Sequence, residues 1–254
     1  MARTALITGA SSGLGAEYAR QLAARGMDLV LVARDREALA VLAASLRDRH
    51  RVRVEVLAAD LLHPRQRERV VARLSDAEHP IDMLVNNAGY GLRQGFEAND
   101  IDDEVRHLEL HVTVPMRLIR AVLPGMLRRE SGRIVNVASV AALVPRGTYG
   151  AAKAWLVSFS RWANVHYRDR GISVTAVCPG FVHTNFHERL GLPPGDEGVP
   201  EWMWLNAPEV VAQSLRDVAR GRSISIPSAR YKALVALSRV LPDAVVVAAA
   251  ERGR

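Results

Sequence analysis

The feature that most constrains the fold of this chain is a regular alternation of short apolar runs with longer segments of helical period. An apolar run at residues 4–8 precedes a helical segment to about Arg25, and a run at 28–33 precedes another to about Arg49. This alternation is typical of β-α-β units, because parallel strands need a long crossover between them. It therefore predicts a Rossmann-type, doubly wound parallel sheet with helices on both faces. The five further strands that complete a seven-stranded sheet are expected near residues 53–57, 83–85, 133–138, 173–177 and 223–226.

Turn and capping residues fall where this fold needs them. Gly26 follows the first predicted helix, Asp35 suits the N-cap of the second, and Pro64 lies near the start of the third. We therefore expect helix boundaries close to these three residues.

No internal repeat or low-complexity linker divides the chain, so we predict one domain over residues 1–254. The long irregular stretch at about 184–208 is rich in proline and glycine, and stretches of this kind are usually binding loops. A helical tail is expected at about 229–254.

Composition indicates a globular protein, with 49% hydrophobic and 24% charged residues. The lone Cys178 cannot form an intramolecular disulfide and no secretory signal is recognisable at the start, so a cytoplasmic location is expected. No apolar run reaches the roughly 18 residues of a membrane span. The closest, at 234–250, is interrupted by Arg239 and Asp243, which leaves open a peripheral membrane contact through the tail.

The net charge of +7 is carried by arginines that are scattered and not interleaved with aromatic residues. This pattern argues against a nucleic-acid partner. It fits either a solvated face or a basic cleft that attracts a phosphorylated cofactor. We predict no metal centre.

The turn between the first strand and the first helix has the sequence TGASSGLG, from Thr8 to Gly15. Glycines allow a tight turn and a close backbone approach, and the helix N-terminus offers unpaired N–H groups to a diphosphate. Taken alone, the motif is also compatible with a simple tight connection. The residues expected to contact a cofactor here are Gly9, Ser11, Ser12, Gly13, Leu14 and Gly15.

The residue that follows the second strand selects between two nicotinamide cofactors. A fold that prefers NAD(H) places an acid there for the ribose hydroxyls, whereas this chain has Arg34 after Ala33. A guanidinium pairs with a 2′-phosphate that a carboxylate would repel. Asp35 suits a helix cap better than that missing acid, so the sequence predicts NADP(H), with Arg36 as a second candidate contact.

Polar and small residues also follow the third and fourth strands. Asp60 and Leu61 come after one, and Asn87, Ala88 and Gly89 after the other. Ligands of open α/β sheets bind at the carboxyl ends of strands, so we expect these five residues to border the cofactor, although each alone is also an ordinary turn residue.

Tyr149 and Lys153 lie four positions apart in a segment of helical character and so share one helix face. A fixed ammonium near a phenol favours the phenolate and suits the hydroxyl to proton transfer. Ser139, at the end of the fifth strand, is either a third member of this group or a turn cap.

The motifs TGASSGLG, NNAG, the serine of NVAS, YGAAK and the CPG of Cys178 to Gly180 occur in the order found in short-chain dehydrogenases/reductases. The sequence resembles this family from Arg3 to Pro227. The resemblance implies hydride transfer between the nicotinamide and a carbonyl or secondary alcohol. It implies that Tyr149 exchanges the proton, Ser139 holds the oxygen, and Lys153 lowers the tyrosine pKa and binds the nicotinamide ribose.

The resemblance also implies where other residues lie. Asp60 would contact the adenine, and Asn87 and Gly89 would lie against the cofactor and steady the sheet. It implies a homodimer or homotetramer built from helices near 105–127 and 148–168. The residues that would border the nicotinamide are Pro179, Gly180, Val182 and Thr184.

Two departures from the family pattern are visible. Ser139 and Tyr149 are ten positions apart, which is shorter than usual and predicts a shortened loop. His111 stands where the family commonly has a catalytic asparagine. Pro115, four residues later, has no N–H, so it should free the His111 carbonyl and interrupt a helix expected from about 103 to 128. In the family the asparagine supports a water that links the lysine to solvent, so the resemblance implies a catalytic role for His111, in which its backbone carbonyl holds that water. The alternative is that His111 is a packing residue and the relay is absent.

Two functions remain open from the sequence. One is an oxidoreductase, and the other is a cofactor-binding module without chemistry, for which an intact Tyr149 and Lys153 pair would have no use. The substrate is undefined, because the aromatic and apolar residues of the later loops either line an apolar pocket or simply pack. These residues are Trp155, Phe181, Phe186, Trp202, Trp204 and Leu205.

Overall fold

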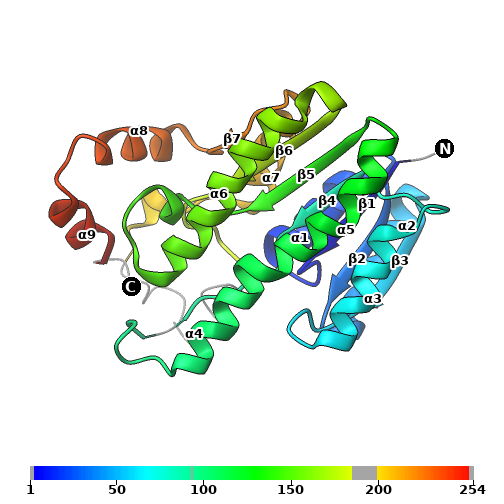
Figure 1. Cartoon of the computed structure of the whole chain (residues 1–254), viewed down its shortest axis with the longest axis horizontal. Helices are drawn as coiled ribbons and strands as arrows, with labels where there is room; N and C mark the ends of the chain where they lie inside the picture. Colours follow the sequence, from blue (N-terminus) through cyan, green and yellow to red (C-terminus); the bar gives the residue numbers. More distant parts are fainter. Residues whose placement is uncertain (1–2, 93, 185–198, 252–254) are drawn as a thin grey trace.

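The computed structural model describes residues 3–92, 94–184 and 199–251, and it contains a seven-stranded sheet in the order β3-β2-β1-β4-β5-β6-β7 (Figure 1). All neighbouring strands are parallel, so the predicted doubly wound sheet is confirmed. The strands are β1 (Thr4–Thr8), β2 (Asp28–Ala33), β3 (Val54–Ala58), β4 (Met83–Asn86), β5 (Gly132–Val137), β6 (Ile172–Val177) and β7 (Ile224–Ser225).

Helices connect the strands and continue after the last one. In chain order they are α1 (Gly13–Ala23), α2 (Arg36–His50), α3 (Pro64–Ser75), α4 (Ile101–Leu108), α5 (Val114–Arg128), α6 (Gly147–Tyr167), α7 (Ala207–Ala219), α8 (Ala229–Ser238) and α9 (Asp243–Glu251). Short helical turns complete the set: η1 (Glu109–Thr113), η2 (Val140–Leu143), η3 (Arg168–Arg170) and η5 (Glu201–Met203).

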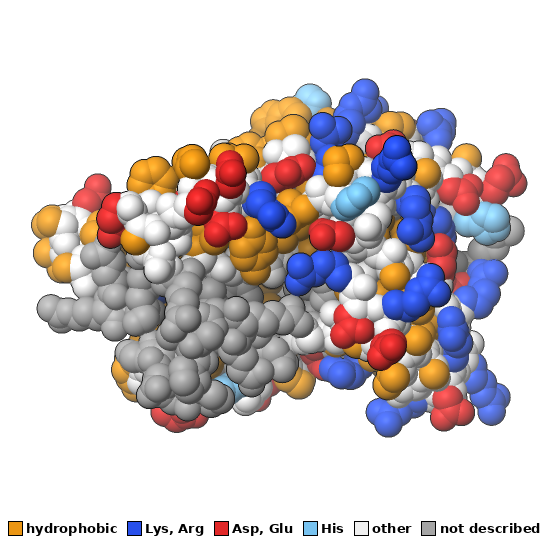
Figure 2. Space-filling model, turned by 90° about the horizontal axis from the view of Figure 1, so that it is seen from below, with side chains coloured by type: hydrophobic (Ala, Val, Ile, Leu, Met, Phe, Trp, Pro, Cys, Tyr) orange, Lys and Arg blue, Asp and Glu red, His pale blue; other side chains and the backbone are white. Residues whose placement is uncertain are grey.

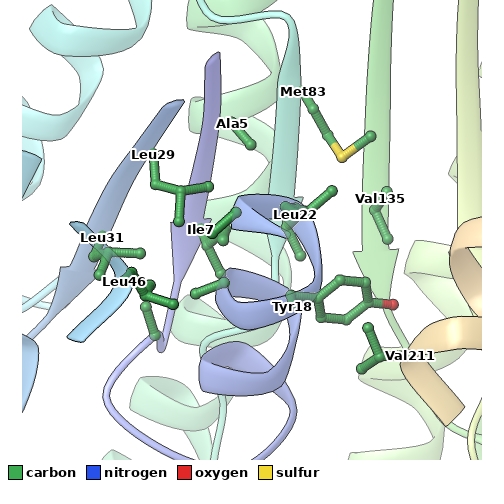
Figure 3. Packing of buried hydrophobic residues seen from close by; sticks show 14 of the residues in the cluster. Ala5, Ile7, Tyr18, Leu22, Leu29, Leu31, Leu46, Met83, Val135 and Val211 are labelled. Carbon is green, nitrogen blue, oxygen red and sulfur yellow. The ribbon is translucent and has the colours of Figure 1, made fainter. Parts of the chain in front are cut away.

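The two faces of the sheet bury two separate hydrophobic clusters, because successive side chains of a strand point to opposite faces. In β1, Ala5 and Ile7 pack on one face with α1, α2 and α7, whereas Leu6 packs on the other face with α3, α5 and α6. Figure 3 shows Tyr18 and Leu22 of α1 among the strand residues of the first cluster. Both faces are therefore covered by helices, as continuous apolar strands require.

The carboxyl ends of all strands lie on one edge of the sheet. Strand order reverses between β1, which pairs with β2 on one side, and β4 on the other. Such a reversal opens a crevice at the carboxyl edge, which is where ligands of open α/β sheets bind.

Local signals in the sequence located most boundaries. Each observed strand agrees with its expected range to within two residues, Asp35 caps α2 through a 2.9 Å bond from the Ala38 N–H, and Pro64 begins α3. The predicted helix at about 103–128 is real but is divided by η1, a π-helical turn. This irregularity lies next to Pro115, where a missing N–H was expected to disturb the helix.

The predicted loop at about 184–208 falls mostly on residues 185–198, which lie outside the described residues together with Phe186. Of the remainder, η5 precedes α7, and the predicted tail contains α8 and α9, which extend away from the sheet (Figure 1). None of the helices in the described ranges is long and apolar enough to cross a membrane.

The basic side chains are unevenly distributed over the visible surface (Figure 2). On the face shown in Figure 2, lysines and arginines cover one half of the molecule and are interspersed with acidic side chains.

Candidate active site

The glycine-rich turn joins β1 to α1 at the carboxyl edge of the sheet. Gly9 and Gly13 have φ values of 65° and 54°, a region that favours glycine. A Cβ on Gly15 would lie 2.1 Å from the Gly9 carbonyl oxygen, so a side chain there would destroy the turn. The result is a concave backbone surface at the N-terminus of α1, which fits a diphosphate.

The NNAG segment after β4 is bonded directly to this turn. Asn87 donates from Nδ2 to the carbonyl oxygens of Thr8 and Gly9, at 2.9 and 3.2 Å. The N–H groups of Asn87 and Ala88 both donate to Thr8 Oγ1, at 2.9 and 3.0 Å. Asn87 thus holds together the two strands that border the crevice, as expected. The role of the Thr8 side chain was not predicted, although a threonine at a strand end is a common bonding partner for a neighbouring turn.

The residues after β2 and β3 lie at the same edge. Arg34 is exposed, while Asp35 is engaged as the α2 cap and is therefore not a ribose-binding acid. Asp60 Oδ1 accepts from the Leu62 N–H at 2.9 Å. Leu61 is only 5% exposed and packs in the core, so any cofactor contact it makes must come from its backbone.

Ser139 and Tyr149 meet despite their short separation in sequence. Ser139 ends β5 and caps η2 by accepting from the Ala141 N–H at 3.1 Å, and its side chain is also hydrogen-bonded to Tyr149. The single turn of η2, the three residues 144–146 and the first turn of α6 span the gap. Ser139 is therefore both a turn cap and a neighbour of the phenol.

Lys153 lies one helical turn below Tyr149 and is 4% exposed. Its Nζ donates to the Val137 carbonyl at 2.8 Å and lies 5.8 Å from the centre of the Tyr149 ring. The shared helix face expected from the spacing of four is thus observed.

The protonation of this pair is governed by burial. Burial raises the pKa of Tyr149 to about 12, although the hydrogen bond with Ser139 and the charge of Arg146 oppose this shift. Burial also lowers the pKa of Lys153 to about 7. Burial outweighs the groups that lower the tyrosine pKa here, and the expected lowering by Lys153 remains a prediction for the protein with its cofactor bound. Desolvation favours the neutral form of both groups, and a partly neutral amine stabilises a phenolate weakly.

Two histidines lie behind Tyr149, one of which the sequence analysis missed. His111 is 1% exposed, and its Nε2 lies 2.8 Å from the Tyr90 carbonyl oxygen. His107, one turn earlier, is equally buried, with its ring centre 4.3 Å from that of His111 and 5.9 Å from that of Tyr149. The spacing of four between the histidines on an expected helix was the signal that places them together.

Both histidines are neutral at physiological pH, because burial lowers the pKa of each and the charge of Lys153 lowers it further. His111 also explains why Gly89 carries no side chain, since a Cβ there would lie 2.6 Å from the His111 ring. Within the described part of the chain, His107 Nε2 and His111 Nδ1 have no hydrogen-bond partner.

The segment after β6 closes the crevice from the other side. The Pro179 carbonyl accepts from the Val140 N–H at 2.9 Å, which joins this segment to the residue that follows Ser139. Val182 pairs with Leu205, and a Cβ on Gly13 would lie 3.2 Å from the Thr184 side chain. The glycine-rich turn, Ser139 and the CPG segment are therefore in contact through neighbouring residues.

The aromatic residues divide between packing and the edge of the crevice. Trp155 stacks on Phe159 along α6, with 5.1 Å between ring centres. Phe181 and Trp204 lie 5.8 Å apart beside the CPG segment. No group of three metal-ligating side chains comes together among residues 3–92, 94–184 and 199–251.

A family model described as short chain dehydrogenase matches residues 3–193, and the chain belongs to this family. Its structure is similar to that of a short-chain dehydrogenase from Sphingobium yanoikuyae in complex with NADPH, at 38% identity and a TM-score of 0.85 over 93% of each chain. It is also similar to a bulky-bulky ketone specific alcohol dehydrogenase from Comamonas testosteroni, at 34% identity and a TM-score of 0.80 over 93% of this chain and 92% of that one.

A very-long-chain 3-oxoacyl-CoA reductase of Anas platyrhynchos is 34% identical over 205 residues. That match covers 78% of this chain but 65% of the relative, which is just under two thirds of its length. Together these similarities identify an oxidoreductase that transfers hydride between a nicotinamide cofactor and a carbonyl or alcohol group.

Proposed function

We propose that this protein transfers hydride between NADP(H) and the carbonyl or secondary alcohol group of an apolar small molecule, with Tyr149 as the proton-transferring residue. The observation that carries the proposal is the contact of Tyr149 with Ser139, with Lys153 one turn below, at the sheet edge that holds the glycine-rich turn.

In the direction of reduction, NADPH held at the glycine-rich turn would supply the hydride that the carbonyl carbon receives. Tyr149 donates its phenolic proton to the carbonyl oxygen, so the product is an alcohol and the phenol becomes a phenolate. Ser139 hydrogen-bonds the same oxygen and orients it toward the phenol. In oxidation the proton returns from the alcohol to the phenolate.

Lys153 restores the proton balance in this scheme. With a pKa of about 7, Lys153 gives a proton as the ammonium or takes one as the neutral amine near neutrality, and its bond to the Val137 carbonyl fixes the Nζ below the phenol. A phenolate formed during turnover also favours the charged ammonium, because opposite charges in a buried site attract strongly.

The cofactor preference rests on Arg34. No acid occupies the end of β2, since Ala33 ends the strand and Asp35 is used as a cap. An exposed guanidinium at this point suits a 2′-phosphate, and the similar Sphingobium yanoikuyae structure contains NADPH. The glycine-rich turn would hold the diphosphate, with Ser11, Ser12 and Leu14 beside it.

An apolar substrate fits the residues on the nicotinamide side of the crevice. Phe181 is half-buried beside Gly180, and Trp204 packs against it. The Comamonas testosteroni relative is named for ketones with two bulky groups, which supports testing ketones of that kind first.

We also propose a homo-oligomer that associates through α4, α5 and α6, whose outer faces expose large apolar side chains. A cytoplasmic location remains a prediction that rests on the single cysteine, Cys178. The exposed apolar residues on these helices are Ile101, Val105, Leu108, Met116, Trp162 and Val165.

The decisive experiment replaces Tyr149 with phenylalanine and follows NADPH absorbance with a panel of bulky ketones. Turnover should fall on the order of 10²-fold or more, because only the acid/base hydroxyl is removed. NADPH binding should persist, since the Tyr149 ring can keep its contacts with His107 and His111.

Tyr167→Phe is the matched control, because Tyr167 lies at the other end of the same helix and contacts Trp162. This variant should behave as wild type. Near-normal turnover in Tyr149→Phe would contradict the acid/base role of Tyr149, whereas a wild-type protein that binds NADPH but reduces no ketone would favour a cofactor-binding module.

A further inference from the structure

A tyrosine outside the family motifs is built into the wall of the crevice. Tyr231 lies in the first turn of α8 and is 3% exposed. Its hydroxyl accepts from the Phe181 N–H at 3.1 Å and donates to the Met203 carbonyl at 2.8 Å. One side chain therefore satisfies a backbone donor and a backbone acceptor that are far apart in sequence.

These two bonds extend a pairing between the same two segments. Val182 and Leu205 form a parallel bridge, in which the His183 N–H donates to the Leu205 carbonyl at 3.0 Å. The Leu205 N–H donates in turn to the Phe181 carbonyl at 2.9 Å. The Tyr231 hydroxyl lies at the end of this pairing, so it forms a hydrogen bond with each segment at the point where the two separate.

The Tyr231 ring makes a second contact, on Gly180. A Cβ on Gly180 would lie 1.9 Å from the Tyr231 ring, so only glycine fits beneath it. Tyr231 also belongs to a small apolar cluster that includes Leu14 of the glycine-rich turn and Val140, the residue after Ser139. The ring thus belongs to a cluster against which residues from the glycine-rich turn and from η2, after β5, both pack.

We infer that Tyr231 is a positioning residue of the active site, through which α8 holds the segment 179–184 in place. The inference rests on the proposed function, in which this segment borders the nicotinamide. A phenylalanine would fill the same volume but would remove the bonds that the Tyr231 hydroxyl makes with the Phe181 N–H and the Met203 carbonyl, and the loss of buried hydrogen bonds is costly. The hydroxyl therefore matters for the position of the segment, beyond the packing of the ring.

The test compares Tyr231→Phe with Tyr18→Phe by amide hydrogen exchange and by kinetics. Tyr18 is a suitable control because it is 1% exposed and its hydroxyl is bonded to Ser214 Oγ at 2.6 Å, in the core between α1 and α7. In Tyr231→Phe, exchange at Phe181 and Leu205 should be about tenfold faster or more, while the strand amides of β1 and β5 stay protected. Tyr18→Phe should leave exchange at Phe181 unchanged.

The kinetic readout separates positioning from binding. In Tyr231→Phe, kcat should fall about tenfold, because a displaced segment misaligns the reacting groups. The Kd for NADPH should change less than about threefold, since the glycine-rich turn and Arg34 are untouched. Gly180→Ala is a second variant that pushes the ring away without removing the hydroxyl, and it should produce the same faster exchange at Phe181.

Two results would overturn the inference. Unchanged exchange at Phe181 in both variants would show that Tyr231 does not hold the segment. Faster exchange with kcat and KM within twofold of wild type would show that the contact is structural only. A wild-type protein that reduces none of the ketones would instead refute the proposed function, and the exchange result would still stand.

Discussion

At the scale of single residues, the chemistry of this protein depends on which groups are buried and which are exposed. Lys153 and the two histidines are almost fully buried, so their protonation is set by desolvation. Arg34 is exposed at the edge of the sheet and remains available to an anion. The role of Arg34 is therefore tested by cofactor binding, and the state of the buried amine by the pH dependence of stability.

Arg34→Ala should weaken NADPH binding by about 1.5 kcal/mol, which is roughly tenfold in Kd. This is the lower end for a charged hydrogen bond, because an exposed pair is screened by solvent. NADH binding should change little, since NADH has no 2′-phosphate. Equal affinities for NADPH before and after the substitution, measured by fluorescence titration, would remove Arg34 from the site.

The buried amine of Lys153 should make stability depend on pH. Its pKa is about 7 in the folded protein, below the ordinary value of 10.5, so between these values the unfolded state binds more protons. The free energy of unfolding should therefore rise with pH in this window. Below the window, the cost of burying the charged amine should be fully present. Relative to Lys153→Met, the wild type should gain about 1 kcal/mol between pH 7 and pH 8 in urea unfolding.

The range from pH 7 to pH 8 avoids other buried groups. Cys178 and Tyr149 have raised pKa values, so they lower stability only as pH approaches their ordinary values of 9.0 and 10.0. The lowered pKa values of His107 and His111 affect stability only below the ordinary histidine pKa of 6.5. A constant difference between the wild type and Lys153→Met across the window would mean that the amine is charged when folded.

At the scale of elements, the helix that passes behind Tyr149 is interrupted where the family usually has an asparagine. The π-helical turn η1 contains His111 and ends just before Pro115. Because proline has no N–H to donate, it is compatible with a helix whose backbone hydrogen-bond pattern is irregular at this point. The His111 side chain is engaged with the Tyr90 backbone, so the His111 backbone carbonyl remains our candidate for holding a water near Lys153.

His111→Asn should keep activity within roughly tenfold, about 1.4 kcal/mol of barrier, if the backbone holds that water. Pro115→Ala should be more damaging, because it adds an N–H able to occupy a carbonyl of the turn. Steady-state kcat, measured with both variants on one ketone, tests whether the backbone of this turn or the His111 side chain is required. A loss of several hundredfold in His111→Asn, with Pro115→Ala unaffected, would make the imidazole itself the essential group.

At the scale of the whole molecule, helices α4 and α6 expose several large apolar side chains. Trp162 and Val165 are 53% and 74% exposed on α6, and Val105 is 57% exposed on α4. Apolar surface of this kind on a folded subunit commonly marks an interface, and symmetric association is the usual form.

We expect Val165→Asp combined with Val105→Asp to convert a dimer or tetramer to monomer, as seen by light scattering at micromolar concentration. The paired change places charges on a surface that association would bury. Val41→Asp is a matched control, because Val41 is 73% exposed on α2, outside the proposed interface. A wild-type protein that is strictly monomeric would refute the proposed oligomer.

The sheet, the glycine-rich turn, the cap at Asp35 and the pairing of Tyr149 with Lys153 could all be predicted from the amino-acid sequence. These depend on local periodicity, on conformational preferences and on spacing along one helix, all of which are visible within a few residues. Strand boundaries were accurate for the same reason, since parallel strands buried on both faces are continuous apolar runs.

The protonation of the site, and the neighbours of its residues, could be seen in the tertiary structure alone. The sequence analysis expected Lys153 to lower the pKa of Tyr149, but burial dominates, and burial is set by elements that are distant in sequence. His107 and Tyr231 were missed because neither belongs to a motif. Each acquires its place from packing, His107 through η1 and α6, and Tyr231 through its contact with Gly180 across 51 positions of the chain.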